Sequence, residues 1–173
     1  MKIILVGFMG AGKTTVGRLL ARELQCQHHD LDDLIVQTAG KSIPEIFSES
    51  GNTGFRALEH ETLVQALDMV GILSTGGGTP IQAQNYDLLR THATPVVLLD
   101  ADPTTIMSRI GGDANRPLVK QLGETGLIEL KAERNPRYYE LADLVIQTDE
   151  LTPEDIVGDI VAWLNDGQKR VAK

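Results

Sequence analysis

The most informative segment of this 173-residue chain is Ile3-Ile-Leu-Val-Gly-Phe-Met-Gly-Ala-Gly-Lys-Thr14. Its first four residues form a continuous apolar run, which predicts a short strand buried on both faces of a sheet. The remainder, Gly7–Thr14, fits the pattern G-x-x-x-x-G-K-[ST] and leads into helical spacing of apolar residues over Lys13–Gln25. A strand, a glycine-rich turn and a helix in this order predict a P-loop, whose backbone N–H groups surround phosphate oxygens.

The side chains at the end of this stretch predict what it binds. In a P-loop the lysine, here Lys13, reaches the β- and γ-phosphates of a nucleoside triphosphate, and the next hydroxyl, on Thr14, binds Mg²⁺. We therefore expect ATP and one Mg²⁺ ion here, with ATP held by Gly10, Ala11, Gly12, Lys13, Thr14 and Thr15. The alternative interpretation is a plain tight turn into a helix.

Further along the chain, short apolar runs alternate with segments of helical spacing. We expect strands at Val70–Ser74, Pro95–Leu99 and Leu144–Gln147, and helices at Asp30–Ala39, at Ile43–Leu67 with a break near Gly51, and from Pro153 onward, capped by Thr152. This alternation predicts a parallel sheet with helices on both faces, whose ligands bind beyond the carboxyl ends of the strands. Glycine-bearing loops are expected at Gly76–Gly78 and Gly111–Gly126, and the length of the second is typical of a lid.

Two acids follow the position where we expect a second short strand to end, in His29-Asp-Leu-Asp-Asp33. Asp30 and Asp32 are two residues apart, so on extended backbone their side chains would point the same way. One could then lie near the metal ion while the other accepts a hydrogen bond from a substrate hydroxyl. Either acid could instead cap the following helix. Asp100, after a later strand, is a weaker candidate for the metal than Asp30.

Glycines and arginines are the remaining candidates for binding an anionic substrate. They are Gly76, Gly77, Gly78, Arg56, Arg116 and Arg134. Three consecutive glycines let the backbone approach a ligand, although they could also form a merely flexible turn. Each arginine could be a solvated surface residue. A kinase for an acidic metabolite, however, needs a forked donor for the carboxylate and a mobile cation for the transferring phosphoryl group.

The overall charge narrows the class of partner. The chain has 16 Lys and Arg against 24 Asp and Glu, a formal net charge of −8. Such a surface argues against binding nucleic acid or an anionic membrane, since both require a basic face. The apolar run at the amino end is too short for a signal peptide, and no stretch is long enough for a membrane span. The single Cys26 fits a reducing compartment, so we expect a cytoplasmic protein.

Taken in their order, these segments resemble the shikimate kinases, P-loop relatives of the nucleoside monophosphate kinases. The segments are GFMGAGKT from Gly7, HDLD from His29, Gly54-Phe-Arg-Ala-Leu-Glu59, STGGG from Ser74, Asn115-Arg-Pro-Leu118 and Glu133-Arg-Asn-Pro136, with Tyr138 close behind. The resemblance runs from Met1 to about Leu164. It implies a three-layer α/β/α P-loop fold in one domain over residues 1–173, with a five-stranded parallel sheet in the order 2-3-1-4-5.

On the acceptor side, the resemblance implies a substrate-binding section at about residues 31–60. Asp32 matches the acid that holds the substrate hydroxyls. Arg56 and Arg134 match the pair that binds the shikimate carboxylate, and the backbone of Gly76–Gly78 lines the same pocket.

On the nucleotide side, the resemblance implies a closing lid at about residues 110–125. Arg116 matches a lid arginine that reaches the phosphates, and Arg109 matches a contact near the adenine. Asp30 matches the outer-shell support of Mg²⁺ bound to Thr14. Two positions, Leu31 and Val119, depart from the residues usual in the family, but neither carries a chemical role.

The resemblance implies transfer of the γ-phosphate of ATP to the 3-hydroxyl of shikimate, a step of aromatic amino-acid biosynthesis, with Lys13, Asp32 and Arg116 as the catalytic residues. We expect a monomer whose partners are ATP and shikimate. A kinase for a nucleotide is a rival, but an aromatic content of 4% offers few groups to stack a second base. Gluconate, which also carries a carboxylate and hydroxyls, stays open as the acceptor. So does a nucleotide-gated binding protein with little turnover.

Overall fold

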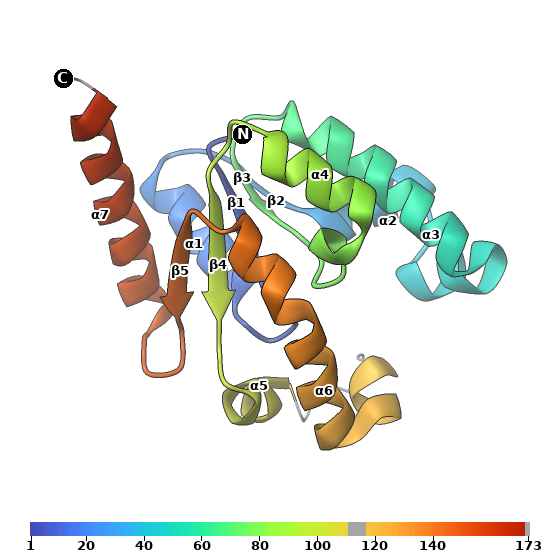
Figure 1. Cartoon of the computed structure of the whole chain (residues 1–173). Helices are drawn as coiled ribbons and strands as arrows, with labels where there is room; N and C mark the ends of the chain where they lie inside the picture. The colour runs from blue at the N-terminus through green and yellow to red at the C-terminus, as the bar shows by residue number, and fades with distance from the viewer. Residues whose placement is uncertain (111–116, 172–173) are drawn as a thin grey trace.

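The computed structural model describes residues 1–110 and 117–171, and the side chains of residues 1–110 and 122–166. Its sheet is parallel and has five strands in the order β2-β3-β1-β4-β5 (Figure 1). The strands are β1 (Ile3–Val6), β2 (His28–Asp30), β3 (Ile72–Ser74), β4 (Val96–Asp100) and β5 (Leu144–Gln147). The expected sheet and its strand order are confirmed.

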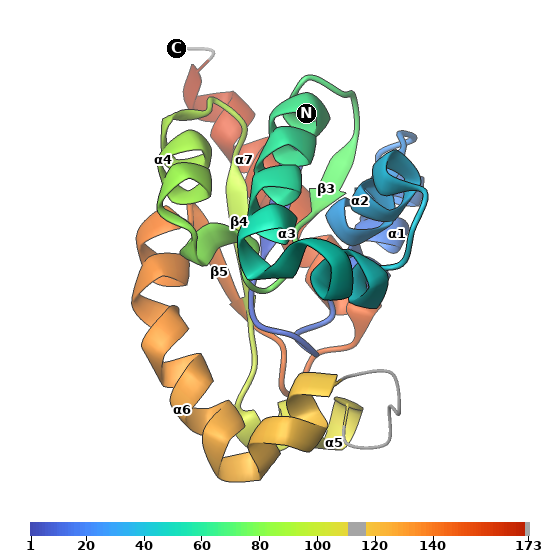
Figure 2. The ribbon, with the colours of Figure 1, turned by 90° about the vertical axis from the view of Figure 1, so that its right-hand side faces the viewer.

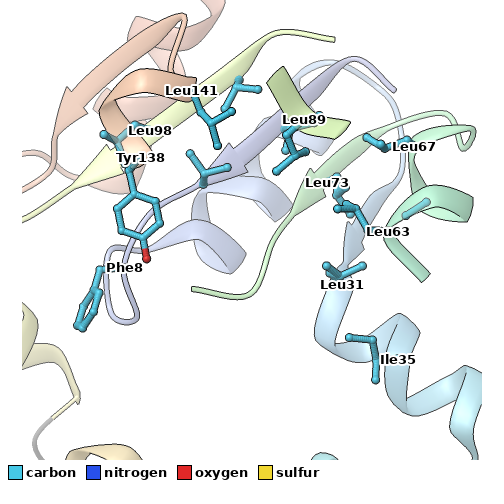
Figure 3. Packing of buried hydrophobic residues seen from close by; sticks show 14 of the residues in the cluster. Phe8, Leu31, Ile35, Leu63, Leu67, Leu73, Leu89, Leu98, Tyr138 and Leu141 are labelled. Atoms are coloured by element: carbon cyan, nitrogen blue, oxygen red, sulfur yellow. The ribbon is translucent and has the colours of Figure 1, made fainter. Parts of the chain in front are cut away.

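Helices cover both faces of this sheet (Figures 1 and 2). The helices of one face are α1 (Lys13–Glu23) and α7 (Pro153–Val171), and those of the other are α3 (Ile43–Leu67), α4 (Ala83–Thr91) and α6 (Pro117–Leu141). Ile3 and Leu5 of β1 join the core under α1 and α7. Ile4 and Val6 join the opposite core, part of which Figure 3 shows. The apolar run of β1 is therefore buried from both sides, as the sequence predicts.

The remaining elements gather near the carboxyl ends of the strands. They are α2 (Leu31–Ala39), a short 3₁₀ turn at Thr79–Ile81 and α5 (Pro103–Ile110). Figure 1 shows α5 and the beginning of α6 beyond the ends of β4 and β5. Within the described residues, no helix is both long and apolar enough to cross a lipid bilayer.

Two local expectations about helices are confirmed. The long helix α3 is interrupted at Gly51, which has a φ of 63°. At the start of α7, the Thr152 hydroxyl oxygen accepts a hydrogen bond from the Asp155 N–H (3.2 Å), and the Asp155 carboxylate accepts one from the Thr152 N–H (3.0 Å). This reciprocal pair caps the helix at the predicted residue.

The expectation that Asp30 and Asp32 share an extended segment is wrong. Strand β2 ends at Asp30, and Asp32 lies in the first turn of α2. The cause is local, because the Asp30 side chain accepts a hydrogen bond from the Asp32 N–H (3.1 Å) and so caps the helix. The two carboxylates therefore reach the site from a strand end and from a helix.

The expected loop up to Gly126 is also too long. Helix α6 already begins at Pro117, since proline is favoured at the first position of a helix. Gly123, with a φ of 61°, kinks this helix without ending it. Residues 111–116, which fall within the predicted lid, lie outside the described residues.

Candidate active site

The P-loop connects β1 to α1 in the middle of the sheet. It begins at Gly7, where the φ of 142° and the close approach of β4 exclude a side chain, because an added Cβ would lie 2.2 Å from the Leu99 carbonyl oxygen. It ends at Gly12, which caps α1 with a φ of 100° and no side-chain hydrogen bond. The backbone N–H groups of the first turn of α1 are thus available for phosphate.

A cavity of about 480 Å³ lies against this loop. It is lined by every residue within the described part of the chain that the sequence predicts to bind nucleotide: Gly10, Ala11, Gly12, Lys13, Thr14, Thr15 and Arg109. Its wall also includes candidates for the acceptor and the metal, namely Asp30, Asp32, Gly76 and Gly77. Residues predicted to bind the nucleotide and residues predicted to bind the acceptor therefore line the same cavity.

Lys13 lies over the loop that precedes it. Its Nζ donates hydrogen bonds to the carbonyl oxygens of Gly7 (2.8 Å) and Phe8 (2.9 Å). The ammonium group is thereby held at the centre of the phosphate-binding backbone, and burial makes its charge more effective than it would be in water.

Asp30 serves two partners at once. Its Oδ2 accepts a hydrogen bond from the Thr14 hydroxyl (2.8 Å), and its Oδ1 accepts the one from the Asp32 N–H. The two interpretations of Asp30, helix cap and metal support, are therefore compatible, because each uses a different oxygen. A hydroxyl oxygen backed by a carboxylate belongs to the hard oxygen donors that Mg²⁺ prefers.

Burial raises the pKa of Asp32 to about 6, and the negative charge of Asp30 adds to the increase while Lys13 opposes it. At neutral pH the carboxylate is thus largely ionised, yet its pKa lies in the range suited to accepting a proton. The side chain lies against the glycine cluster, since a Cβ added to Gly76 would be 3.0 Å from Asp32 Oδ1.

Each glycine of the cluster Gly76–Gly78 closely approaches a different part of the site, namely α2, the P-loop or α3. Besides Gly76 at Asp32, an added Cβ at Gly77 would lie 3.3 Å from the Met9 backbone nitrogen, and one at Gly78 would lie 2.9 Å from Arg56 Nη2. These approaches explain why three glycines occur here, and they favour close packing over a merely flexible turn.

Arg56 follows the break in α3 by five residues and forms an ion pair one turn along the helix. Its Nη1 donates to Glu59 Oε2 (2.8 Å), while Glu59, only 1% exposed, also accepts from the Thr79 hydroxyl (2.9 Å). Arg56 Nε is buried and has no hydrogen-bond partner among the described residues. Glu59 is not among the predicted site residues, although an acid three residues after an arginine on a helix indicates such a pair.

Arg134 projects from α6 toward the P-loop. Its guanidinium carbon lies 5.7 Å from the centre of the Phe8 ring. One turn later, the Tyr138 hydroxyl donates to the Gly77 carbonyl oxygen (2.5 Å), and burial raises the pKa of Tyr138 to about 12. In Figure 3, Tyr138 and Phe8 lie on the same side of the hydrophobic cluster that contains both residues. Arg56, Gly78 and Arg134 lie beside the cavity and are not among the described residues that line it.

The other two predicted arginines are Arg109 and Arg116, which the sequence places on the nucleotide side. Arg109 lines the cavity and donates to the carbonyl oxygen (2.6 Å) and the hydroxyl (2.9 Å) of Thr148. These bonds fix Arg109 next to Thr148, the residue that follows β5. Arg116 lies outside the described residues.

The contact between Gly78 and Arg56 gives a test of position without loss of charge. Gly78→Ala is expected to raise the KM for the phosphoryl acceptor roughly tenfold, because the new methyl group displaces the guanidinium and small misplacements are costly. The melting temperature should change little, since the φ of −89° suits alanine and the contacted atoms end a flexible side chain. The matched control is Gly158→Ala on α7, where a Cβ meets nothing within 4 Å. An unchanged KM in steady-state kinetics would contradict this placement of Arg56.

A phosphate-binding backbone that shares one cavity with a partly buried carboxylate of raised pKa is the arrangement of an enzyme that moves phosphoryl groups, and the chain is a P-loop phosphotransferase. A family model described as shikimate kinase matches residues 9–165. The chain belongs to the shikimate kinase family, and it is an ATP-dependent kinase that phosphorylates a hydroxyl of shikimate. The family resemblance noted in the sequence is confirmed.

Relatives in sequence and in structure agree with this assignment. The shikimate kinase of Limosilactobacillus fermentum is 44% identical over 173 residues, which cover 99% of this chain and all of that protein. The solved structure of the shikimate kinase from Acinetobacter baumannii in complex with shikimate has a TM-score of 0.89 and 36% identity, covering 96% of this chain and 93% of the other. That from Aquifex aeolicus has a TM-score of 0.83 and 32% identity, covering 97% and 98%.

Proposed function

We propose that this kinase transfers the γ-phosphate of ATP to the 3-hydroxyl of shikimate, giving shikimate 3-phosphate and ADP, and that separate groups of residues bind the acceptor, hold the metal ion and stabilise the transferring phosphoryl group. The observation that carries the proposal is that Asp32, a partly buried carboxylate with a raised pKa, lines the same cavity as the P-loop. A hydroxyl that is hydrogen-bonded to Asp32 would face the nucleotide directly. The shikimate complex of the Acinetobacter baumannii relative supports this choice of acceptor.

The acceptor carboxylate would bind Arg56 and Arg134. The buried Nε of Arg56 needs an acceptor, and Glu59 already fixes the other side of this guanidinium. Arg134 approaches from the opposite element, α6, and the Gly76–Gly78 backbone lies between them without intervening side chains. Two forked donors suit the planar carboxylate of a small acid. The section at about residues 31–60 would thus bind the acceptor.

One Mg²⁺ ion would be held by the Thr14 hydroxyl and the phosphates of ATP, with Asp30 as the carboxylate behind Thr14. When bound, such an ion neutralises charge on the β- and γ-phosphates. The short hydrogen bond between Thr14 and Asp30 orients the hydroxyl oxygen, and this positioning is the contribution of the chain itself.

Phosphoryl transfer in this site would depend on position and charge. Lys13 stabilises negative charge on the transferring group, and Asp32 orients the acceptor hydroxyl and receives its proton. Arg109 would lie beside the adenine. Arg116, on a lid at about residues 110–125, would add a second positive charge and exclude water when the lid closes.

Arg134→Lys tests the carboxylate assignment because it keeps the charge and removes the fork. We expect the KM for shikimate to rise about 10- to 100-fold, the effect of losing a hydrogen bond to a charged group, with little change in the KM for ATP. The matched control is Arg137→Lys on the same helix, where the arginine donates to the Ile81 carbonyl oxygen. A change confined to the KM for ATP would place Arg134 on the nucleotide side instead.

The acceptor itself is tested by ADP release with shikimate, gluconate, nucleoside monophosphates or water. We expect release to depend on shikimate and on Mg²⁺. Turnover with gluconate and none with shikimate would overturn the proposal. ATP binding without any acceptor-dependent release would instead indicate a nucleotide-gated binding protein.

A monomer in the cytoplasm completes the proposal. A net charge of −8 and the single cysteine support a protein of a reducing compartment with no affinity for nucleic acid or anionic membranes. Sedimentation of the purified chain measures the oligomeric state, and a dimer would contradict this part alone.

A further inference from the structure

A buried ion pair joins α6 to the end of β4. Lys131 Nζ lies 2.8 Å from Asp100 Oδ1, and the two residues are 6% and 7% exposed. The other carboxylate oxygen, Oδ2, accepts a hydrogen bond from the Tyr139 hydroxyl (2.7 Å). The Ala101 N–H also donates to Oδ1 (3.0 Å). The carboxylate of Asp100 therefore has three partners, namely two side chains of α6 and the backbone N–H that follows β4.

Such a pair is not explained by stability alone. Lysine is rarely buried, and removing both charges from water costs about as much as their attraction returns, so an apolar pair of similar size would often be as stable. Burial by itself would raise the pKa of Asp100, but the hydrogen bonds from Lys131 and Tyr139 outweigh it and hold the pKa below its usual value. Asp100 is thus ionised, and each of its two carboxylate oxygens has a defined side-chain partner.

The two side-chain partners of Asp100 lie on either side of an interruption in the hydrogen bonding of α6. Pro136 is inside this helix, where it cannot donate the usual hydrogen bond to the residue four positions earlier. Lys131 precedes the proline and Tyr139 follows it, and both contact the same carboxylate. Arg134 lies between these two contacts.

Asp100 also lies next to a residue that contacts the P-loop. Leu99, next to Asp100 on β4, packs against Gly7, where the P-loop begins. Lys131, Arg134 and Tyr138 recur at helical spacing on one side of α6, and Arg134 and Tyr138 reach Phe8 and Gly77. Asp100 therefore links the helix that carries Arg134 to the strand against which the phosphate loop is packed.

We propose that Asp100 is a positioning residue that braces α6 across Pro136, through Lys131 on one side and Tyr139 on the other, and thereby holds Arg134 in place to bind the acceptor carboxylate. This inference rests on the proposed function, because it takes Arg134 as a carboxylate ligand. It assigns Lys131, Asp100 and Tyr139 to acceptor affinity although none of the three lines the cavity.

The direct test measures shikimate binding by calorimetry. Lys131→Met is expected to weaken binding roughly tenfold, since it breaks the ion pair, and Tyr139→Phe, which removes only a hydroxyl, should weaken it about threefold. ATP binding should stay unchanged. The matched control, Arg90→Met, removes an exposed pair with Asp87 on α4 and should have no effect. If Lys131→Met proves unfolded in circular dichroism, the result for Tyr139→Phe decides.

A double-mutant cycle separates positioning from general loosening. In an Arg134→Ala background, Lys131→Met and Tyr139→Phe should weaken shikimate binding by less than twofold, because the residue through which they act is gone. The same loss in both backgrounds, or no loss in the parent, would overturn the inference. A parent chain that does not bind shikimate at all would instead contradict the proposed function.

Discussion

Asp32→Asn is expected to lower kcat with shikimate by about 10² to 10⁴, the usual contribution of a group that accepts a proton in the transition state. The substitution keeps the size of the side chain, and the cap of α2 is Asp30, so the helix should be unaffected. ATP binding, measured by calorimetry, should be retained. Turnover close to that of the parent would remove Asp32 from the catalytic step. Loss of ATP binding would place it with Asp30 at the metal.

The pKa of Asp32 adds a pH dependence to this prediction. Because the folded-state pKa of about 6 is above the unfolded value of 3.8, the stability that Asp32 adds is present below about pH 4 and is lost as the pH rises through about 6. At pH 8 the Asn variant should therefore melt no lower than the parent. In the parent, kcat/KM should rise with pH around 6 as the carboxylate ionises, and this step should be missing in the variant. An identical rise in both proteins would assign it to another group.

Lys13→Met is expected to lower kcat by about 10² to 10³ or more, because it removes a preorganised charge from the transferring phosphoryl group. The substitution keeps most of the apolar stem. It also removes the hydrogen bonds to the carbonyl oxygens of Gly7 and Phe8, so ATP binding should weaken as well. The control is Lys2→Met, whose exposed ammonium group donates only to the Leu24 carbonyl oxygen among its described contacts. A kcat within a few-fold of the parent would contradict the role of Lys13.

The features that the sequence predicts well are those specified by neighbouring residues. The spacing of Gly7, Gly12, Lys13 and Thr14 defines the P-loop, and the apolar runs define strands β1 and β4 to within a residue or two. The sequence also predicts Thr152 as the cap of α7, because its partner Asp155 lies three residues away. The break at Gly51 follows from glycine's access to positive φ.

The features that the sequence could not predict depend on residues far apart in the chain. The pairing of Asp100 with Lys131 joins residues 31 positions apart, and no local pattern indicates it. The same holds for the approach of Gly78 to Arg56. The segment after β2 is a local case: the sequence leaves open whether Asp30 and Asp32 lie on extended backbone or at the start of a helix, and the hydrogen bond from the Asp32 N–H to the Asp30 side chain decides between the two. The early start of α6 is also local, because the glycines of this segment favour a loop while Pro117 favours the first position of a helix.

The proposed reaction places the γ-phosphate of ATP on one particular hydroxyl of shikimate. Phosphorus NMR of the product, with coupling traced to the ring protons, tests this directly. We expect a phosphate monoester coupled to the proton on carbon 3, formed in equal amount to ADP. A phosphate on another hydroxyl, or ADP accompanied only by inorganic phosphate, would contradict transfer to the 3-hydroxyl of shikimate.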